Sequence, residues 1–192
     1  FVCGGLDELG AFCEEVEAAF LLLQMPDNQT KTIQKNLNAC RSLRIPYILW
    51  KNDFEKLATE KILVPIGFLE EEIEKAQFAA AFGRFFGSEI TLLQAKDYGS
   101  KAATTTAKMK TLLDKFSLKY DVQLAENDSF KIDKEAVKVA EKDAYGLLLI
   151  SASREYGLDD IIFGSKERKA VQKSSVPILL VNPRGDLYAL CD

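Results

Sequence analysis

Residues 62–66 read Ile-Leu-Val-Pro-Ile, a continuous apolar run that Gly67 follows directly. Runs of the same kind occupy residues 90–93 (ITLL), 147–150 (LLLI) and 178–181 (ILLV). Apolar runs without polar alternation are typical of strands buried on both faces, as in a parallel sheet covered by helices. We therefore expect these four segments to be central strands.

Helical patterns separate the runs. Residues 70–86, 102–120 and 133–142 each place apolar side chains along one helical face, and residues 122–124 form a short strand between the last two helices. The first of these helices opens with three glutamates and ends near Gly87, as the helix dipole and a glycine stop favour. The order β-α-β-α-β-α-β-loop-α-β predicts an α/β, Rossmann-like fold with an open, doubly wound parallel sheet.

The first 52 residues repeat the pattern of the second half of this unit. Residues 17–23 (EAAFLLL) are similar to 143–149 (DAYGLLL), and residues 45–50 (IPYILW) are similar to 176–181 (VPILLV). The repeat would contain a strand at 1–3, a helix at 9–17, a strand at 21–25, a helix at 30–43 and a strand at 45–50. Because internal repetition changes a fold assignment, we predict a partial repeat over residues 1–56 and a complete domain over 60–192, with a polar linker near 52–59.

Bulk composition narrows the classes of function. The chain is 47% hydrophobic and 28% charged, which is ordinary for a globular protein, and its net charge is −4. A net negative surface does not attract phosphate backbones, so we do not expect a nucleic-acid partner. No apolar run approaches the roughly 18 residues of a membrane span, and no signal-peptide pattern is found. We therefore expect no membrane association and a cytoplasmic location.

Residue types exclude several catalytic devices. The chain contains no histidine, which excludes a histidine-based triad or zinc site. No GxSxG, GxxxxGK[ST] or GxGxxG motif occurs, so no enzyme activity is expected. The glutamates at 70–72 are interpreted as dipole partners of a helix, not metal ligands. The four cysteines are expected to be reduced, and a Cys3–Cys13 or Cys40–Cys191 bridge is the alternative.

Two segments at carboxyl ends of strands are candidates for ligand binding, because open parallel sheets bind ligands there. One is residues 64–67 (VPIG), and the other is the loop over residues 150–165, which ends in Gly164-Ser165 before a predicted helix. A glycine and a hydroxyl at a helix start can direct backbone N–H groups and the Ser165 Oγ toward an anion. Ser165 is equally well explained as a helix N-cap without any ligand.

Residues 61–183 resemble the universal stress protein family. That family opens with a strand ending in V-P-V-D, binds ATP through a loop written G-x-x-G, nine residues, then G-S or G-T, and closes with a strand like C-P-V-L-V-V. Here residues 62–66 and 176–181 match the two strands, and Gly164-Ser165 matches the G-S pair. The resemblance implies the strand order 3-2-1-4-5. It also implies a nucleotide site made of Pro65, Ile66, Gly67, Ala95, Ile150, Ser151, Arg154, Gly164, Ser165 and Lys166.

Departures from the family pattern decide the predicted function. Gly67 stands where the family has an aspartate that looks like a contact to the nucleotide's sugar or base, and Ser151 and Arg154 stand where the loop has glycines. Glycine allows positive φ and close approach of the backbone to a phosphate. Arg154 adds bulk, although its charge could attract a phosphate. We therefore predict a degenerate ATP loop and a non-enzymatic regulatory or interaction module of the stress response, without a cofactor. A sensor of ATP, AMP or a cyclic dinucleotide that uses the remodelled loop is the alternative.

The resemblance also predicts an assembly. Fifth strands of two such domains commonly pair across a dimer interface, which implies that residues 46–51 lie antiparallel beside 177–182. The repeat would then form an intrachain pseudo-dimer and leave residues 21–25 as an uncovered edge. Exposed edges invite pairing, so a homodimer or further chain would be needed to shield it. The protein partner of the module is not identified by the sequence.

Overall fold

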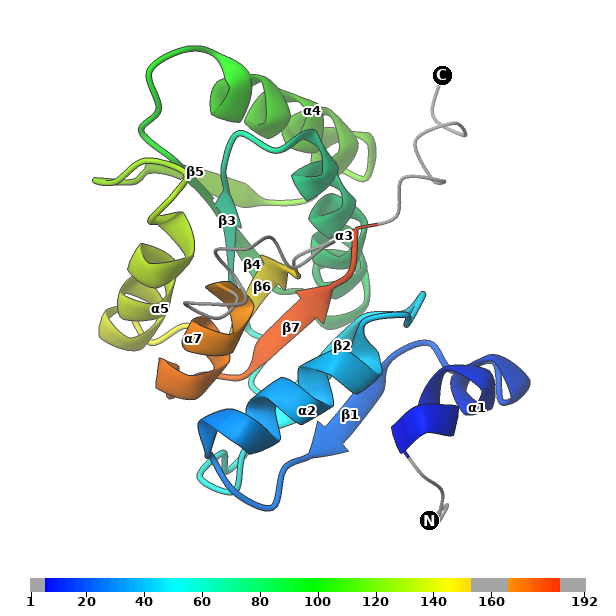
Figure 1. The fold of residues 1–192 in the computed structure, drawn as a ribbon. Helices are drawn as coiled ribbons and strands as arrows, with labels where there is room; N and C mark the ends of the chain where they lie inside the picture. Colours follow the sequence, from blue (N-terminus) through cyan, green and yellow to red (C-terminus); the bar gives the residue numbers. More distant parts are fainter. Residues whose placement is uncertain (1–5, 153–165, 184–192) are drawn as a thin grey trace.

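The computed structural model describes residues 6–152 and 166–183 (Figure 1). In this part of the chain the strands are β1 (Leu21–Gln24), β2 (Tyr47–Trp50), β3 (Lys61–Ile66), β4 (Glu89–Gln94), β5 (Tyr120–Leu124), β6 (Leu147–Ser151) and β7 (Ile178–Val181). The helices are η1 (Leu6–Glu8), α1 (Leu9–Glu15), α2 (Thr30–Cys40), η2 (Glu70–Glu74), α3 (Lys75–Phe86), α4 (Lys101–Lys115), α5 (Ile132–Lys142) and α7 (Lys166–Lys173). The predicted strand at residues 1–3 lies outside the described residues.

The strands form one sheet in the order β1-β2-β7-β6-β3-β4-β5. From β3 to β7 all pairings are parallel, and the order confirms the predicted 3-2-1-4-5 arrangement. β2 lies antiparallel to β7, with Tyr47 opposite Leu180 and Ile48 opposite Leu179, as predicted. β1 pairs in parallel with β2 and ends the sheet, so it has no second neighbour among the described residues.

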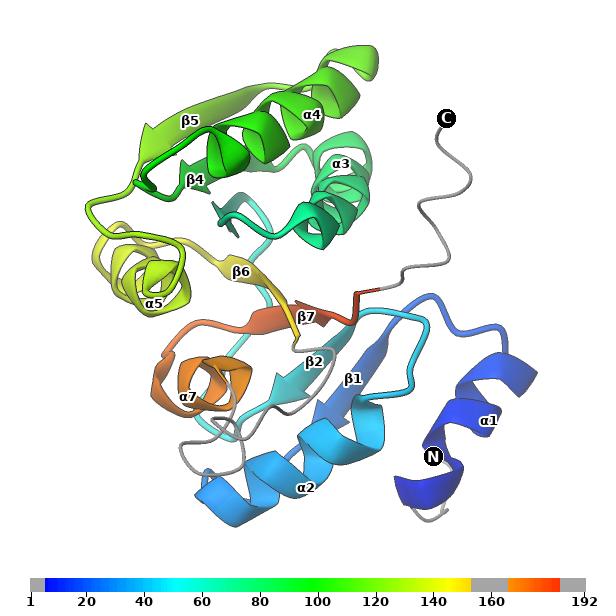
Figure 2. The ribbon, with the colours of Figure 1, turned by 45° about the horizontal axis from the view of Figure 1, so that its top comes forward.

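Helices cover both faces of the sheet (Figures 1 and 2). Leu63 and Leu148 pack into one core with α5, α7 and α2, whereas Ile62 and Leu147 pack into the other core with α3 and α4. Successive strand residues point to opposite faces, so burial on both faces requires the continuous apolar runs seen in the sequence. The N-terminal segment contributes to both cores, including Ile48 in the core of α3 and α4.

Several predicted helix ends were wrong. The helix predicted over residues 70–86 begins as the 3₁₀ turn η2 and becomes α-helical only at Lys75. The helix predicted over 102–120 ends at Lys115, because Ser117 adopts a left-handed conformation (φ 52°) and Tyr120 already starts β5. The helices predicted to end at residues 17 and 43 end at Glu15 and Cys40. Gly87, with φ 67°, ends α3 as predicted.

Two further expectations concern cysteines and membranes. Cys13 and Cys40 are buried free thiols, and burial raises the pKa of both, to about 12 for Cys40. Cys3 and Cys191 lie outside the described residues, so neither proposed bridge is tested. Within the described residues, no helix combines the length and apolar character that crossing a membrane requires.

Candidate functional site

The carboxyl ends of β3, β4 and β6 meet at one edge of the sheet, where the predicted site residues gather. Pro65 and Ile66 end β3, and Ala95, just after β4, donates its N–H to the Ile66 carbonyl at 2.8 Å. Ile150 and Ser151 end the neighbouring strand β6. Pro65, Ile66, Ala95 and Ile150 are buried and Ser151 is half-buried, so the backbone of these strand ends forms the floor of the site.

Lys166 is the first residue of α7, and its side chain is exposed. The three remaining residues of the predicted phosphate loop, Arg154, Gly164 and Ser165, lie outside the described residues. The structure therefore brings together the strand-end half of the predicted site, and the loop assignment stays a prediction.

Gly67 is enclosed by the protein's own polar groups. Its N–H donates to the Glu72 carboxylate. A Cβ added at Gly67 would lie 2.9 Å from Glu72 Oε1 and 2.9 Å from Ser129 Oγ. An aspartate, the family residue at this position, therefore does not fit unless both side chains move. The glycine is required by its surroundings as well as being a departure from the family pattern.

A buried ion pair lies beside Gly67. Lys75 is only 1% exposed, and its ammonium donates to the Pro65 carbonyl and lies 3.4 Å from Glu72 Oε2. The pair forms because η2 gives way to α3 between the two residues, which are three positions apart. A buried charge is tolerated only when it is paired and hydrogen-bonded, and this pair meets both conditions.

Ser129, the other neighbour of Gly67, is held in place from β4. Asp97, which follows that strand, accepts hydrogen bonds from the Ser129 N–H, at 2.8 Å, and from the Ser129 hydroxyl. These bonds fix the segment before α5 to the segment that follows β4, with Ser129 beside Gly67 at the end of β3. The space over Gly67 is thus bounded by η2, which carries Glu72, and by the segment before α5, which carries Ser129 and is held by Asp97 after β4.

Further charges surround the ion pair. Burial raises the pKa of Asp133, in the first turn of α5, to about 6; nearby Lys75 and Lys166 lower it, and Glu72 and Glu167 raise it. We call Glu72, Lys75, Asp133, Lys166 and Glu167 the edge cluster. With all five groups ionised, the edge cluster has three negative and two positive charges, so it offers no excess of positive charge to a phosphate ligand.

Sequence reasoning did not identify this cluster. Glu72 was predicted to be a partner of the helix dipole, and its inward orientation, with the side chain 8% exposed, was not predicted. Lys75, Asp97, Ser129 and Asp133 received no role. The available signal was a glutamate and a lysine three positions apart, directly after a strand end. Among the described residues, no group of three or more cysteine, aspartate or glutamate side chains is arranged to hold a metal ion.

Comparisons with known proteins agree on one family. The family model of the universal stress protein family matches residues 58–182. A universal stress protein from Archaeoglobus fulgidus DSM 4304 superposes with a TM-score of 0.72 at 14% identity, over 94% of this chain and 66% of that one. A candidate member from Pseudomonas aeruginosa UCBPP-PA14 superposes with a TM-score of 0.62 at 11% identity, over 98% of this chain and 72% of that one. The chain thus spans about two thirds of the length of these two proteins.

A shorter relative matches about two thirds of the chain. A universal stress protein solved in complex with cAMP superposes with a TM-score of 0.51 at 10% identity, over 65% of this chain and 98% of that one. At such identities the likeness shows the fold alone. No curated protein sequence matches the chain.

Proposed function

This chain belongs to the universal stress protein family, and from that premise we propose that it is a non-enzymatic regulatory or interaction module whose nucleotide site has been remodelled. The observation that carries the proposal is the buried Glu72–Lys75 pair at the end of β3. The Gly67 N–H donates a hydrogen bond to the Glu72 carboxylate, and the Lys75 ammonium donates one to the Pro65 carbonyl. Two polar groups of the strand end are therefore already satisfied within the protein.

A nucleotide that used these groups would have to displace the pair. Breaking a buried pair so that one charge stays unpaired costs about 3–5 kcal/mol. An affinity loss of that size corresponds to a factor of more than about one hundred in Kd. The edge cluster adds Asp133 and Glu167, whose carboxylates oppose a triphosphate. We therefore expect weak or absent ATP binding, because the ion pair would have to be displaced and because the nearby carboxylates repel the triphosphate.

The alternative function is a nucleotide sensor. It is favoured by the relative solved with cAMP and by the exposed Lys166 at the start of α7, where the family's phosphate loop ends. In this case Arg154 would contact a phosphate in place of the missing loop glycines. Hydrolysis of ATP would need binding first and therefore depends on this alternative.

We further propose the architecture and setting of the module. Residues 1–56 would be a partial repeat and residues 60–192 a complete domain, paired through β2 and β7 as an intrachain pseudo-dimer. A homodimer or a further chain segment would cover the edge of β1, and the protein would work in the cytoplasm in the stress response.

The proposal is tested by thermal unfolding with millimolar ATP and magnesium, AMP, cAMP or a cyclic dinucleotide. We expect no nucleotide to raise the melting temperature by binding at the strand ends, because the contacts there are occupied. A ligand that binds only the folded state would stabilise it by about 2.7 kcal/mol at one hundred times its Kd. Saturable stabilisation by a nucleotide that is lost in Arg154→Glu would refute the proposal and support the sensor.

A further inference from the structure

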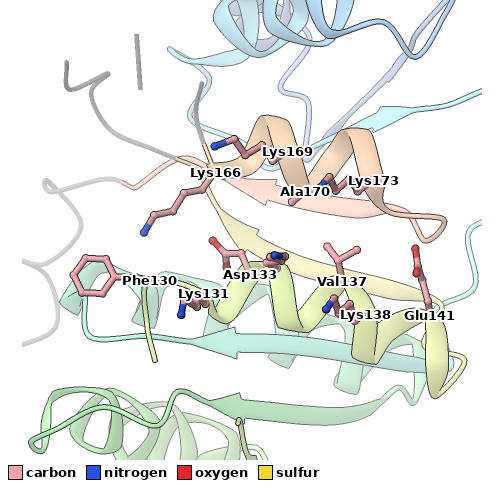
Figure 3. Close-up of a pocket in the computed structure, with 11 residues that line it drawn as sticks. Phe130, Lys131, Asp133, Val137, Lys138, Glu141, Lys166, Lys169, Ala170 and Lys173 are labelled. Carbon is pink, nitrogen blue, oxygen red and sulfur yellow. The ribbon is translucent and has the colours of Figure 1, made fainter. Parts of the chain in front are cut away.

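A groove of about 590 Å³ lies between α5 and α7 (Figure 3). Val137 and Ala170 contribute buried apolar side chains to its lining. The groove also carries six lysines: Lys131, the N-cap residue of α5, Lys134 and Lys138 from α5, and Lys166, Lys169 and Lys173 from α7. Its volume falls within the roughly 300–1,000 Å³ typical of small-molecule sites.

The lysines form two matching rows. On each helix they recur at positions i, i+3 and i+7, which places all three on one helical face. α5 and α7 each lead into a strand of the same parallel pair, β6 and β7, and run side by side in the same direction (Figure 3). With a rise of 1.5 Å per residue, each row extends along about 10 Å of its helix.

Within the described part of the chain, the groove is lined by six lysines and two carboxylates, Asp133 and Glu141, so its net charge is positive even though Lys166 also lies near Asp133 in the edge cluster. None of the six ammonium groups forms an ion pair there, and all six side chains are exposed. Lys166 lies 5.7 Å from the centre of the Phe130 ring, at one end of the groove. Since the whole chain has a net charge of −4, this groove is a local concentration of positive charge against the overall balance.

Acidic side chains bound the groove at its two ends. Asp133 lies near the start of α5, and Glu141 lies near its end, where it accepts a hydrogen bond from the Ser175 N–H at 3.0 Å. The two residues are eight positions apart on the helix, which corresponds to about 12 Å. A long anionic polymer laid along the groove would meet a carboxylate at each end, so a short anion is favoured.

We propose that this groove binds a short linear polyanion built of three or more linked phosphate groups. Lysine ammoniums are compact charges on flexible stems, which can follow tetrahedral phosphates without the planar geometry that an arginine–carboxylate pair requires. Single-stranded nucleic acid is disfavoured because Phe130, at one end, is the one aromatic side chain among the lining residues and no row of rings offers stacking to successive bases. The groove lies between two helices, apart from the strand-end contacts of Glu72 and Lys75, and the proposal goes beyond the proposed function.

The test is calorimetric titration of the full chain with sodium tripolyphosphate at low salt, with orthophosphate for comparison. We expect tripolyphosphate to bind at least about tenfold more tightly than orthophosphate, because several lysines act on one ligand. Lys138→Glu/Lys173→Glu should weaken this binding at least about tenfold. Lys110→Glu/Lys115→Glu, two exposed lysines of α4 on the other face of the sheet, makes the same change in net charge and should change the affinity by less than about threefold.

Three results would overturn the assignment: no saturable binding of tripolyphosphate, equal weakening by the two double variants, or equally tight binding of a glutamate oligomer of the same charge. The same variants separate this site from the nucleotide site. Binding of ATP through the groove would be lost in Lys138→Glu/Lys173→Glu, whereas binding at the strand ends would survive that change and would contradict the proposed function instead.

Discussion

Lys75→Met is the most informative perturbation of the remodelled site. Methionine fills a similar volume but leaves the buried Glu72 carboxylate without its cation and the Pro65 carbonyl without its donor. The first loss costs about 3 kcal/mol or more, and the second about 1 kcal/mol. A total near 4 kcal/mol is a large part of the roughly 5–15 kcal/mol that stabilises a typical protein. The melting temperature should fall by roughly 10 °C.

Urea unfolding measures this change as a lower midpoint at an unchanged slope. The double variant Glu72→Gln/Lys75→Met removes both charges, so it should recover all but about 1 kcal/mol. Lys108→Met is the control, because it breaks an exposed ion pair in which Lys108 Nζ lies 2.7 Å from Glu70 Oε1. Solvent screens that pair, so the urea midpoint should stay unchanged. A loss below about 1 kcal/mol for Lys75→Met, or a double variant as unstable as the single one, would refute the reasoning.

Four other predictions each depend on one feature of the structure. Burial raises the pKa of Asp133 from 3.8 to about 6, so the folded state binds this proton more tightly than the unfolded state. The free energy of unfolding should therefore fall by about 2 kcal/mol as the pH rises from about 4 to 6. Asp133→Asn should remove most of this pH dependence in urea titrations. Gly146→Ala should destabilise by about 3 kcal/mol, since its Cβ would lie 2.2 Å from the Ala58 carbonyl oxygen. Gly87 has a φ of 67° and open space around it, so Gly87→Ala should destabilise the protein by only about 1 kcal/mol. A larger fall in melting temperature for Gly87→Ala than for Gly146→Ala would contradict both predictions. Residues 58–192 alone should self-associate through β7, which sedimentation would detect, because the strand loses its β2 partner.

The central strands could be predicted because burial on both faces leaves a direct mark, the unbroken apolar run. Their order came from the resemblance to the family, and the sheet confirms it. Helix ends were less accessible. Ser117 follows the end of α4 in a left-handed conformation that glycine usually adopts. Because a serine stands there, no residue type in the sequence signals the end of the helix. The ion pair of Glu72 was not predicted, because a glutamate in a first turn has the same sequence signal whether it points to solvent or inward. Only the 3₁₀ geometry of η2, which packing determines, turns its carboxylate toward Gly67.

Gly67 departs from the family pattern together with its surroundings, because Glu72 and Ser129 fill the space beside it. The carboxylate that the family supplies from position 67 is present here in another form, because Glu72 reaches the same strand end from five residues further on. That carboxylate accepts a hydrogen bond from the Gly67 N–H and is paired with Lys75, so it is already bound within the protein and is not available to a ligand. Gly67→Asp alone would place a second carboxylate where Glu72 Oε1 and Ser129 Oγ already lie 2.9 Å from the new Cβ. The new Cβ would clash with both side chains, and the new carboxylate would lie near the buried Glu72 carboxylate, so this single substitution would destabilise the fold before it could restore a nucleotide contact.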